Sequence, residues 1–419
     1  MRHIALIDGN NFFVSCERLF RPDLADKPVI VLSSNDGCAI ARSNEAKELG
    51  IKMGQPWFQI RNDPKYREVV PFSSNFALYA DMSNRFMNVL STFSPVHEVY
   101  SIDECFLDLT GFSDIRERAF SIKETVLKYL GLPVCVGIGS TKTLAKLANH
   151  VAKKHPRSPG VFNFNALDEH QQNNVLGAIE VEEVWGIGSR LSVQLRQHGI
   201  QSARDLSQAD AKSMRRRFGV TVERVISELR GESCIAIEEV TPPRQQMMMS
   251  RTFSQALTTL EDLQNAVAFF AGSLARKLRS QGSASSLLQV FIMTDRFAKN
   301  TAQHSPSRCI PFSAPTSDTI LITRMALQAL EACYQAGFSY RRAGVCLSEI
   351  SSADICQMEL FPEQSEDRLA SVMDTINDRF GAGALRLSHN DPHTRNWSPQ
   401  RELMSPRYTT HFAELPVCS

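Results

Sequence analysis

The order of strand-like and helix-like segments over the first 154 residues limits the possible folds more than any other feature. Apolar periodicity predicts strands at 3–8, in two halves of 96–109, and at 133–138. It predicts helices at 11–20, 78–90, 113–129 and 140–154. Once an insert at about 21–77 is set aside, the order is β-α-β-β-α-β, which is typical of the split-βαβ or ferredoxin-like arrangement. The insert is expected to hold its own hairpin, 28–32 with 38–41, and a short helix at 44–49.

Three acidic residues stand at the edges of these predicted strands. Asp8 ends the first strand, and Asp103 and Glu104 lie where the two halves of 96–109 meet. Two carboxylates about 4 Å apart repel each other by roughly 4 kcal/mol at an effective dielectric near 20. Mg²⁺ offsets such repulsion because it prefers carboxylate and phosphate oxygens, and two such ions can catalyse phosphoryl transfer. The alternative is that each acid is an ordinary solvated residue at a strand end.

The adjacency of Asp103 and Glu104 sets a geometric condition. Successive residues of a regular strand point to opposite faces of the sheet. Both side chains can therefore face one metal site only if the backbone turns or bulges there. The predicted junction of two strand halves supplies such a turn, and the carbonyl of Gly9 could add an oxygen ligand.

Phe13 follows the first acid closely. A ring at this position could lie against a nucleotide sugar and exclude a 2′-hydroxyl, which would select deoxyribose. The alternative is that Phe13 is a core residue of the predicted helix. Lys153, at the end of the helix predicted from Ser140, is a candidate contact for triphosphate oxygens, or else a solvated cation.

The rest of the chain predicts three further regions. Residues 175–236 are expected to be helical and rich in arginine. Within them, Gly186 and Gly188 have the spacing of a helix-hairpin-helix turn, whose backbone amides can face a DNA phosphate. The alternative is that these glycines only form a connecting turn between two helices and bind no DNA. Residues 238–246 indicate a linker. Strands and helices alternate over 249–350, where basic residues outnumber acidic ones by four. After 351 the chain shows little periodicity, and we expect no separate core.

The composition limits the class of protein and the number of domains, but it does not indicate a function. The chain has 419 residues, 43% of them hydrophobic and 22% charged, with a net charge of +1. These values are typical of a globular protein of about three domains. No apolar run is long enough to cross a membrane, so a cytoplasmic location is the default expectation. The ten cysteines contain no C-x-x-C pair, which favours reduced thiols over disulfides or zinc.

Several ordered blocks resemble one known family. They run from Ile4 to about Thr410 and are similar to the Y-family DNA polymerases, most closely the UmuC group, the catalytic subunit of the bacterial mutagenic DNA polymerase V. The blocks are 35–38, 41–47, 52–57, 78–83, 100–104, 141–149, 184–188 and 405–410.

The resemblance implies an α+β multidomain fold shaped as an open right hand. It implies a ferredoxin-like palm at 1–20 and 78–170, and small fingers at 21–77. A helical thumb with the helix-hairpin-helix would span 171–236, followed by a linker at 237–248. An α/β little finger would span 249–350, and a C-terminal tail 351–419 would carry segments that bind the sliding clamp and an accessory subunit.

The resemblance also assigns site residues. Two Mg²⁺ ions would be held by Asp8, Asp103 and Glu104, with help from the Gly9 carbonyl. Phe13 would be the steric gate, where close relatives can carry Tyr. Triphosphate contacts would fall on Asn44, Lys47 and Lys153. Two of these depart from the Tyr and Arg that are common in the wider family, and Asn10 replaces the Asp that many members have two residues after the first ligand.

One short motif in the tail indicates a protein partner. Gln357, Met358, Leu360 and Phe361 match the pentapeptide by which such polymerases bind the sliding clamp, with Met358 in place of the usual Leu. The resemblance further implies primer-template DNA, dNTPs, a UmuD-type accessory dimer and the RecA filament as partners, no membrane, and a cytoplasmic location at the nucleoid.

The expected function is error-prone translesion synthesis in SOS mutagenesis. The enzyme would add dNTPs to a primer 3′-hydroxyl opposite damaged bases by two-metal phosphoryl transfer. Two alternatives are a non-catalytic DNA-binding scaffold with the same fold and a two-metal nuclease that uses the same carboxylates to activate water.

Overall fold

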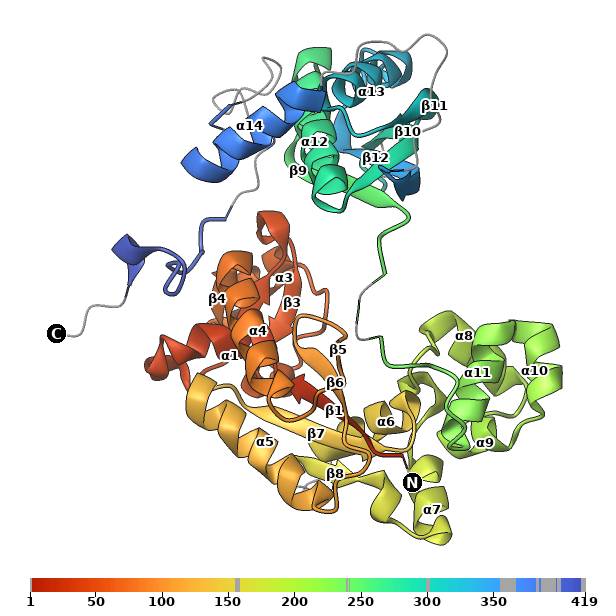
Figure 1. The fold of residues 1–419 in the computed structure, drawn as a ribbon. Helices are drawn as coiled ribbons and strands as arrows, with labels where there is room; N and C mark the ends of the chain where they lie inside the picture. The colour runs from red at the N-terminus through yellow and green to blue at the C-terminus, as the bar shows by residue number, and fades with distance from the viewer. Residues whose placement is uncertain are drawn as a thin grey trace. The chain divides into compact units, whose positions relative to one another are not determined.

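The computed structural model describes residues 2–154, 159–238, 240, 242–298, 302–354, 367–381, 384–385, 397 and 401–415. These residues form two compact units (Figure 1). Unit 1 comprises residues 1–241 together with 401–419, and unit 2 comprises residues 242–400.

The predicted palm is built on a five-stranded sheet in the order β5-β6-β1-β7-β8 (Figure 1). The strands are β1 (Ile4–Gly9), β5 (His97–Val99), β6 (Glu104–Asp108), β7 (Val134–Gly139) and β8 (Val161–Asn163). The first four are antiparallel neighbours in the ferredoxin-like order, which confirms that expectation. The short strand β8 is parallel to β7 and was not predicted.

Helices cover both faces of this sheet. The helices α1 (Phe12–Leu19), α4 (Phe76–Ser91) and α5 (Ile115–Leu130) share one hydrophobic core with it. Helix α6 (Lys142–Lys154) lies on the other face, against Leu6 and Phe106. It approaches β7 so closely that a Cβ on Gly137 would lie 2.0 Å from the backbone nitrogen of Asn149, so only glycine fits there. The side-chain amide of Asn149 donates hydrogen bonds to the backbone carbonyls of Leu6 and Cys135, which fixes α6 against the strands.

The predicted fingers hold a second, three-stranded sheet in the order β3-β2-β4. Strands β2 (Val29–Leu32) and β3 (Ala39–Arg42) form the expected hairpin, and β4 (Val70–Ser73) adds in parallel, which was not predicted. Helices α2 (Asn44–Glu48) and α3 (Trp57–Asn62) pack over a small core with Ile30 and Ile60.

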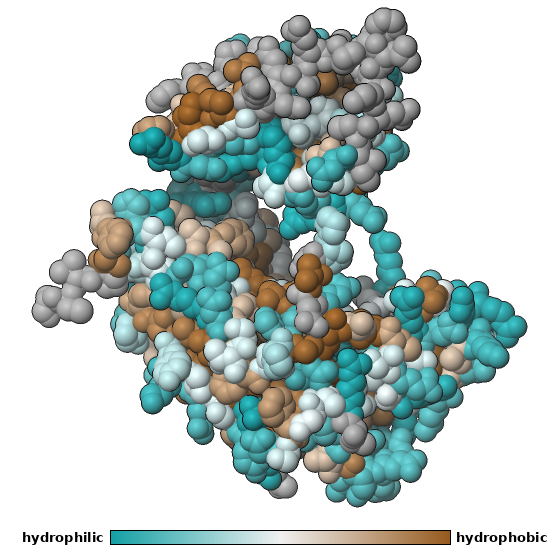
Figure 2. All heavy atoms as spheres, viewed as in Figure 1, coloured by the Kyte–Doolittle hydropathy of each residue, from teal (hydrophilic) through white to brown (hydrophobic). Residues whose placement is uncertain are grey.

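The predicted thumb is helical, as expected. Its helices are α7 (Glu169–Ala178), α8 (Ser189–Gln197), α9 (Ala203–Gln208), α10 (Ala211–Phe218) and α11 (Val220–Leu229). They share a core with residues of α6, including Leu144 and Leu147. Figure 2 shows mostly hydrophilic residues on the visible face of these helices, and the side chains of Arg215–Arg217 are exposed.

Unit 2 is a four-stranded antiparallel sheet covered by two helices (Figure 1). The strands are β9 (Met247–Leu257), β10 (Ser283–Thr294), β11 (Ser307–Thr316) and β12 (Tyr340–Ser352), in the order β11-β10-β12-β9. Helices α12 (Leu260–Ser280) and α13 (Thr319–Cys333) pack on its core. A further helix, α14 (Asp367–Phe380), is joined to α12 by a two-pronged ion pair between Arg279 and Asp374.

The described parts of the tail join the cores of other regions of the chain. Trp397 is buried in the core of unit 2. Residues 401–415 belong to unit 1, where Tyr408 packs against the core of the predicted palm. Within the described residues of the tail, Trp397 and Tyr408 thus extend the two cores already present.

Candidate active site

The three acidic residues meet at one end of the sheet in unit 1. Asp8 on β1 pairs directly with Glu104, the first residue of β6. Asp103 lies in the turn just before β6, and its carbonyl accepts a hydrogen bond of 2.9 Å from the Gly9 amide. The turn that the adjacent acids required is therefore present, because Asp103 precedes the regular strand in which Glu104 lies.

Each carboxylate is held by its own partner. The Lys153 Nζ lies 2.6 Å from Asp8 Oδ2, and Lys146 Nζ lies 2.9 Å from Glu104 Oε1. Asp103 Oδ1 accepts a hydrogen bond of 2.7 Å from the Ser101 hydroxyl. Both lysines come from α6, whose close packing on the sheet brings them to this end.

Lys146 was missed by the sequence analysis. Its Nζ also lies over the ring of Tyr100, 4.3 Å from the ring centroid, and within 5.2 Å of the centroid of Trp185. The Trp185 indole in turn donates to the Tyr100 hydroxyl. Lys146 therefore contacts both Glu104 of the acidic cluster and Trp185, the residue just before the predicted hairpin turn at Gly186.

Burial dominates the electrostatics of Asp8. It raises the pKa of this carboxyl to about 6, although Lys153 acts in the opposite direction. The neighbouring charges of Glu104 and Asp103 act in the same direction as burial, and the pKa of about 6 includes their effect. An acid whose folded-state pKa exceeds its ordinary value of 3.8 destabilises the folded protein once it ionises.

This shift predicts a pH-dependent effect of the substitution Asp8→Asn. The favourable contribution of a protonated Asp8 is present below about pH 4 and is lost as the pH rises through about 6. Asn cannot ionise. The free energy of unfolding of the variant, relative to that of the wild type, should therefore be about 2–3 kcal/mol higher at about pH 8 than at about pH 4. Thermal or urea unfolding in EDTA at both pH values measures this. A stability difference that is the same at both pH values would contradict the prediction.

The donor set fits a hard divalent cation in its chemistry. Three carboxylates and a backbone carbonyl gather at one sheet edge, and oxygen ligands of this kind suit such ions. Among the described residues, however, no three acidic, histidine or cysteine side chains stand at ligand spacing in this conformation. Asp8 and Glu104 are paired with lysines, so binding a shared ion requires that these two carboxylates exchange their partners.

A cavity of about 250 Å³ opens beside the acids. Its lining includes Asp8, Asp103, Phe13, Lys47 and Lys153. The Phe13 ring is half-buried and stacks on the ring of Tyr79, with 4.5 Å between centroids and 15° between planes. Phe13 is therefore placed at the cavity, with a second aromatic ring behind it.

Of the three residues expected to contact a triphosphate, two line the cavity. Lys47 and Lys153 do so, whereas Asn44 is connected to it through Asn11. The Asn11 side chain donates to Asn44 Oδ1 over 3.1 Å and accepts from Lys47 Nζ over 2.6 Å. Burial lowers the pKa of Lys47, and the nearby charges of Arg42 and Lys153 act in the same direction.

Two polar residues that line the cavity, Asn11 and Arg42, were not predicted. Asn11 has a left-handed backbone, with φ of 47°, just before α1, and Asn tolerates this conformation better than most residues. Its position between Asp8 and Phe13 was the available signal. Arg42 also lines the cavity, and its Nη1 donates to the Ile51 carbonyl over 2.8 Å.

The remaining predicted residues lie elsewhere in the chain. Gly186 has φ of +90° and Gly188 precedes the first residue of α8, which is the local geometry expected of the hairpin turn. The motif of Gln357, Met358, Leu360 and Phe361 lies outside the described residues.

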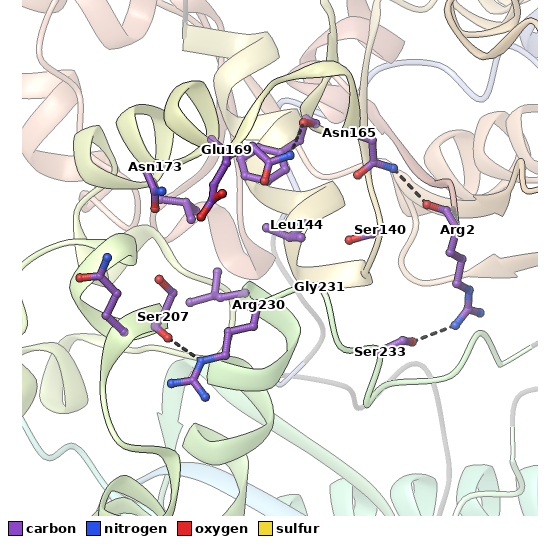
Figure 3. Close-up of a pocket in the computed structure, with 15 residues that line it drawn as sticks. Arg2, Ser140, Leu144, Asn165, Glu169, Asn173, Ser207, Arg230, Gly231 and Ser233 are labelled. Atoms are coloured by element: carbon purple, nitrogen blue, oxygen red, sulfur yellow. Dashed lines mark hydrogen bonds between the residues drawn. The ribbon is translucent and has the colours of Figure 1, made fainter.

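A larger cavity, of about 650 Å³, lies between α6 and the thumb helices (Figure 3). The two arginines that line it make hydrogen bonds within the protein. Arg230 Nε donates to the Ser207 carbonyl, and Arg2 Nη1 donates to the Ser233 hydroxyl. Glu169 supplies the one carboxylate among the described residues that line it. Without paired acids this cavity does not suit phosphoryl transfer, and we place the chemistry in the smaller one.

None of the helices in the described part of the chain is both long and apolar enough to cross a bilayer.

Comparison with known proteins gives a consistent result along the whole chain. Residues 7–150 match the impB/mucB/samB family, residues 244–360 match the impB/mucB/samB family C-terminal domain, and residues 367–418 match a domain of unknown function (DUF4113). Protein UmuC of Salmonella typhimurium (strain LT2) is 42% identical, over 98% of this chain and 99% of the relative. Protein MucB of Escherichia coli is 38% identical over 99% of each.

More distant relatives share the fold. DNA polymerase IV of Dehalococcoides mccartyi (strain CBDB1) is 26% identical over 92% of this chain and 97% of the relative. A Y-family DNA polymerase chimera of Dbh and Dpo4 aligns with a TM-score of 0.64 and 22% identity, covering 83% of this chain and 99% of that one. An insertion ternary complex of Dbh DNA polymerase aligns with a TM-score of 0.55, 21% identity, and coverage of 83% and 98%.

Proposed function

Because the chain belongs to the impB/mucB/samB family, in the UmuC group of the Y-family DNA polymerases, we propose that Asp8, Asp103 and Glu104 form its catalytic centre. The protein is an error-prone translesion DNA polymerase of SOS mutagenesis, which binds primer-template DNA and dNTPs. The observation that supports the proposed site is the pairing of Asp8 with Glu104 beside Asp103. Asp8 and Asp103 line a cavity that Phe13 and two lysines also line.

Catalysis in this family depends on metal ions. We infer that the metal is Mg²⁺, two ions per site, and that Asp8, Asp103, Glu104 and the carbonyl of Gly9 hold them. Such ions, when bound, supply the charge that favours ionisation of the primer 3′-hydroxyl and neutralises the triphosphate. The reaction joins the primer 3′-oxygen to the α-phosphate of the dNTP and releases pyrophosphate.

The protein's own groups prepare this site. Lys153 and Lys146 neutralise Asp8 and Glu104 in the metal-free protein, which keeps the repelling carboxylates together at one sheet edge. We propose that Lys153, Lys47 and Asn44 then turn to the triphosphate oxygens, with Asn11 connecting the last two. Preorganised positive charge of this kind stabilises the charge that develops during phosphoryl transfer.

The role of Lys47 can be measured with the variant Lys47→Ala. Loss of a charge-assisted hydrogen bond to a phosphate should raise the KM for dNTP about tenfold. The primer affinity should stay the same, because Lys47 lies in the nucleotide cavity. Single-nucleotide incorporation at several dNTP concentrations provides the readout, and Lys52→Ala, an exposed lysine on the same insert, is the matched control. An unchanged KM in Lys47→Ala would exclude the contact.

We propose that DNA is held by the thumb and the little finger. The amides at the start of α8 would face a backbone phosphate beyond the turn at Gly186 and Gly188. The exposed run Arg215–Arg217 and the basic excess over 249–350 support phosphate contacts that do not depend on sequence.

The protein partners rest on the sequence motif and the family. We propose that Gln357, Met358, Leu360 and Phe361 bind the sliding clamp, since a polar anchor followed by two apolar residues suits a groove. A UmuD-type accessory dimer and the RecA filament are further proposed partners, and the proposed location is the cytoplasm, at the nucleoid.

Primer extension in the presence of Mg²⁺, on an intact template and on one with an abasic site, tests the proposal. Extension of both templates is expected. Degradation of the primer would instead indicate a nuclease, and DNA binding with neither product would indicate a scaffold.

A further inference from the structure

The C-terminal segment 401–408 lies along the predicted fingers as an added edge. Strand β4 is the edge strand of its sheet, and its last residue, Ser73, pairs with Met404 in a parallel bridge. The Ser73 amide donates to the Leu403 carbonyl over 3.0 Å, and the Leu403 amide donates to the Ser73 hydroxyl over 3.0 Å. Nearby, the Glu402 amide donates to Asp36 over 3.2 Å. We call residues 401–408 the strap.

Buried contacts then fix the strap at the junction of fingers and palm. The side-chain amide of Asn75, which is 1% exposed, donates to the carbonyl and hydroxyl of Ser405 and to the Pro406 carbonyl, over 3.0–3.1 Å. The Tyr408 ring stacks on Phe20 with 4.5 Å between centroids. Backbone pairing, a buried amide and a ring stack therefore all hold one short segment.

A chain of buried contacts leads from the strap to the nucleotide cavity. The Ser405 hydroxyl donates to Glu17 Oε1 over 3.1 Å, and the Tyr79 hydroxyl donates to the same oxygen over 2.6 Å. Glu17 and Tyr79 are both fully buried. The ring of Tyr79 is the one that stacks on Phe13. Burial raises the pKa of Glu17, and the two hydroxyl donors act against that rise.

We propose that the strap is part of the active-site scaffold and that Ser405, through Glu17 and Tyr79, positions the Phe13 ring. The role is new for a segment that matches a domain of unknown function. A buried carboxyl that loses one of its donors must find another partner or shift, because unmet hydrogen bonds in a buried site are costly. Tyr79 donates to the same oxygen of Glu17, so a shift of Glu17 moves Tyr79 as well. The Phe13 ring, which stacks on Tyr79, then loses its fixed position. The inference rests on the proposed role of Phe13 as the gate.

Sugar selectivity of the full-length protein tests the inference. The measured quantity is kcat/KM for a dNTP divided by kcat/KM for the matching rNTP. We expect the ratio to fall about fivefold in Ser405→Ala, through faster use of the rNTP. Ser405→Thr keeps the hydroxyl and should restore the ratio. Thr410→Ala removes a hydroxyl from an exposed site just beyond the strap and should leave the ratio unchanged.

The ratio separates positioning from mere stability. A strap that only stabilised the fold would lower kcat/KM for both nucleotides equally and leave the ratio unchanged, which would overturn the inference. Glu17→Gln is a second variant, which keeps the size of the side chain but removes its charge, and its ratio should also fall. Unchanged ratios in both variants, with normal synthesis by the wild type, contradict this inference alone. A wild type that incorporates no nucleotide contradicts the proposed function and the gate role together.

Hydrogen exchange gives a readout that does not need activity. The amides of Ser73 and Leu403 should be protected in the wild type, because each donates a hydrogen bond across the strap contact. Asn75→Ala should speed the exchange of 401–408, and Thr410→Ala should not. Rapid exchange of these amides in the wild type would overturn the docking on which the inference depends.

Discussion

Replacing Asp103 by Ala is expected to reduce primer extension by about 10³-fold while the protein stays folded. Asp103 lies in a turn, half-buried, and its side chain accepts one hydrogen bond, from the Ser101 hydroxyl, among the described contacts. Its loss should therefore cost little stability. By contrast, the substitution removes one of the three carboxylates that are proposed to hold the metal ions at the reacting phosphate.

Asp108→Ala is the matched control for this experiment. Asp108 lies at the other end of the same strand, β6, opposite Ile4, and away from the cavity. The two variants should unfold at similar temperatures, and only Asp103→Ala should lose extension on an intact template. Full extension by Asp103→Ala would remove the catalytic assignment, and primer degradation by the wild type that stops in the variant would point to a nuclease.

Replacing Phe13 by Ala is expected to admit ribonucleotides. The ring lines the nucleotide cavity and is held by Tyr79 behind it, so it cannot easily withdraw from an added hydroxyl. Relief of a steric clash of this kind is worth about 1–3 kcal/mol, and rNTP incorporation should rise about 10- to 100-fold. Incorporation of dNTP should change much less.

The measurement is kcat/KM for rNTP and dNTP on the same primer-template. Phe380→Ala removes the same side chain from an exposed position on α14 and serves as the control. If Phe13→Ala excludes ribonucleotides as strictly as the wild type does, Phe13 is not the gate and its role is packing beside the acids.

Local patterns predicted the elements that carry the site. The strands β1, β6 and β7 are continuous apolar runs, because helices cover both faces of their sheet. The helices α4 and α5 bury an apolar face against one side of the sheet and α6 against the other. The turn at Asp103 followed from chemistry, since two adjacent acids can share a site only across a bend. The sequence therefore placed Asp8, Asp103 and Glu104 at one sheet edge before the structure did.

Contacts set by tertiary packing could not be predicted in this way. Strands β4 and β8 are short and pair in parallel with distant residues, so their own sequence has no distinct pattern. The pairing of Lys146 with Glu104 depends on how closely α6 docks on β7. The strap mixes polar and apolar residues without a regular period, and a single hydrogen bond such as that of Ser405 cannot be recognised in a sequence pattern.

One missed element did carry a signal. Leu369, Val372, Met373 and Ile376 have the spacing of one helix face, and they lie in α14. The stretch is short, and the little periodicity of the chain after residue 351 led us to expect no separate core there, so this helix was not predicted.

The docked C-terminus has a consequence for the topology of the molecule. The chain leaves unit 1 near residue 241 and returns to it at residue 401, so the little finger is an inserted domain and the rest of the polymerase is its host. A protein shortened to end before residue 401 therefore loses a piece of the host fold rather than a dispensable appendage. If a partner no longer binds after such a deletion, there are two explanations. The deletion removed the motif of this chain to which the partner binds, or it altered the fold of unit 1.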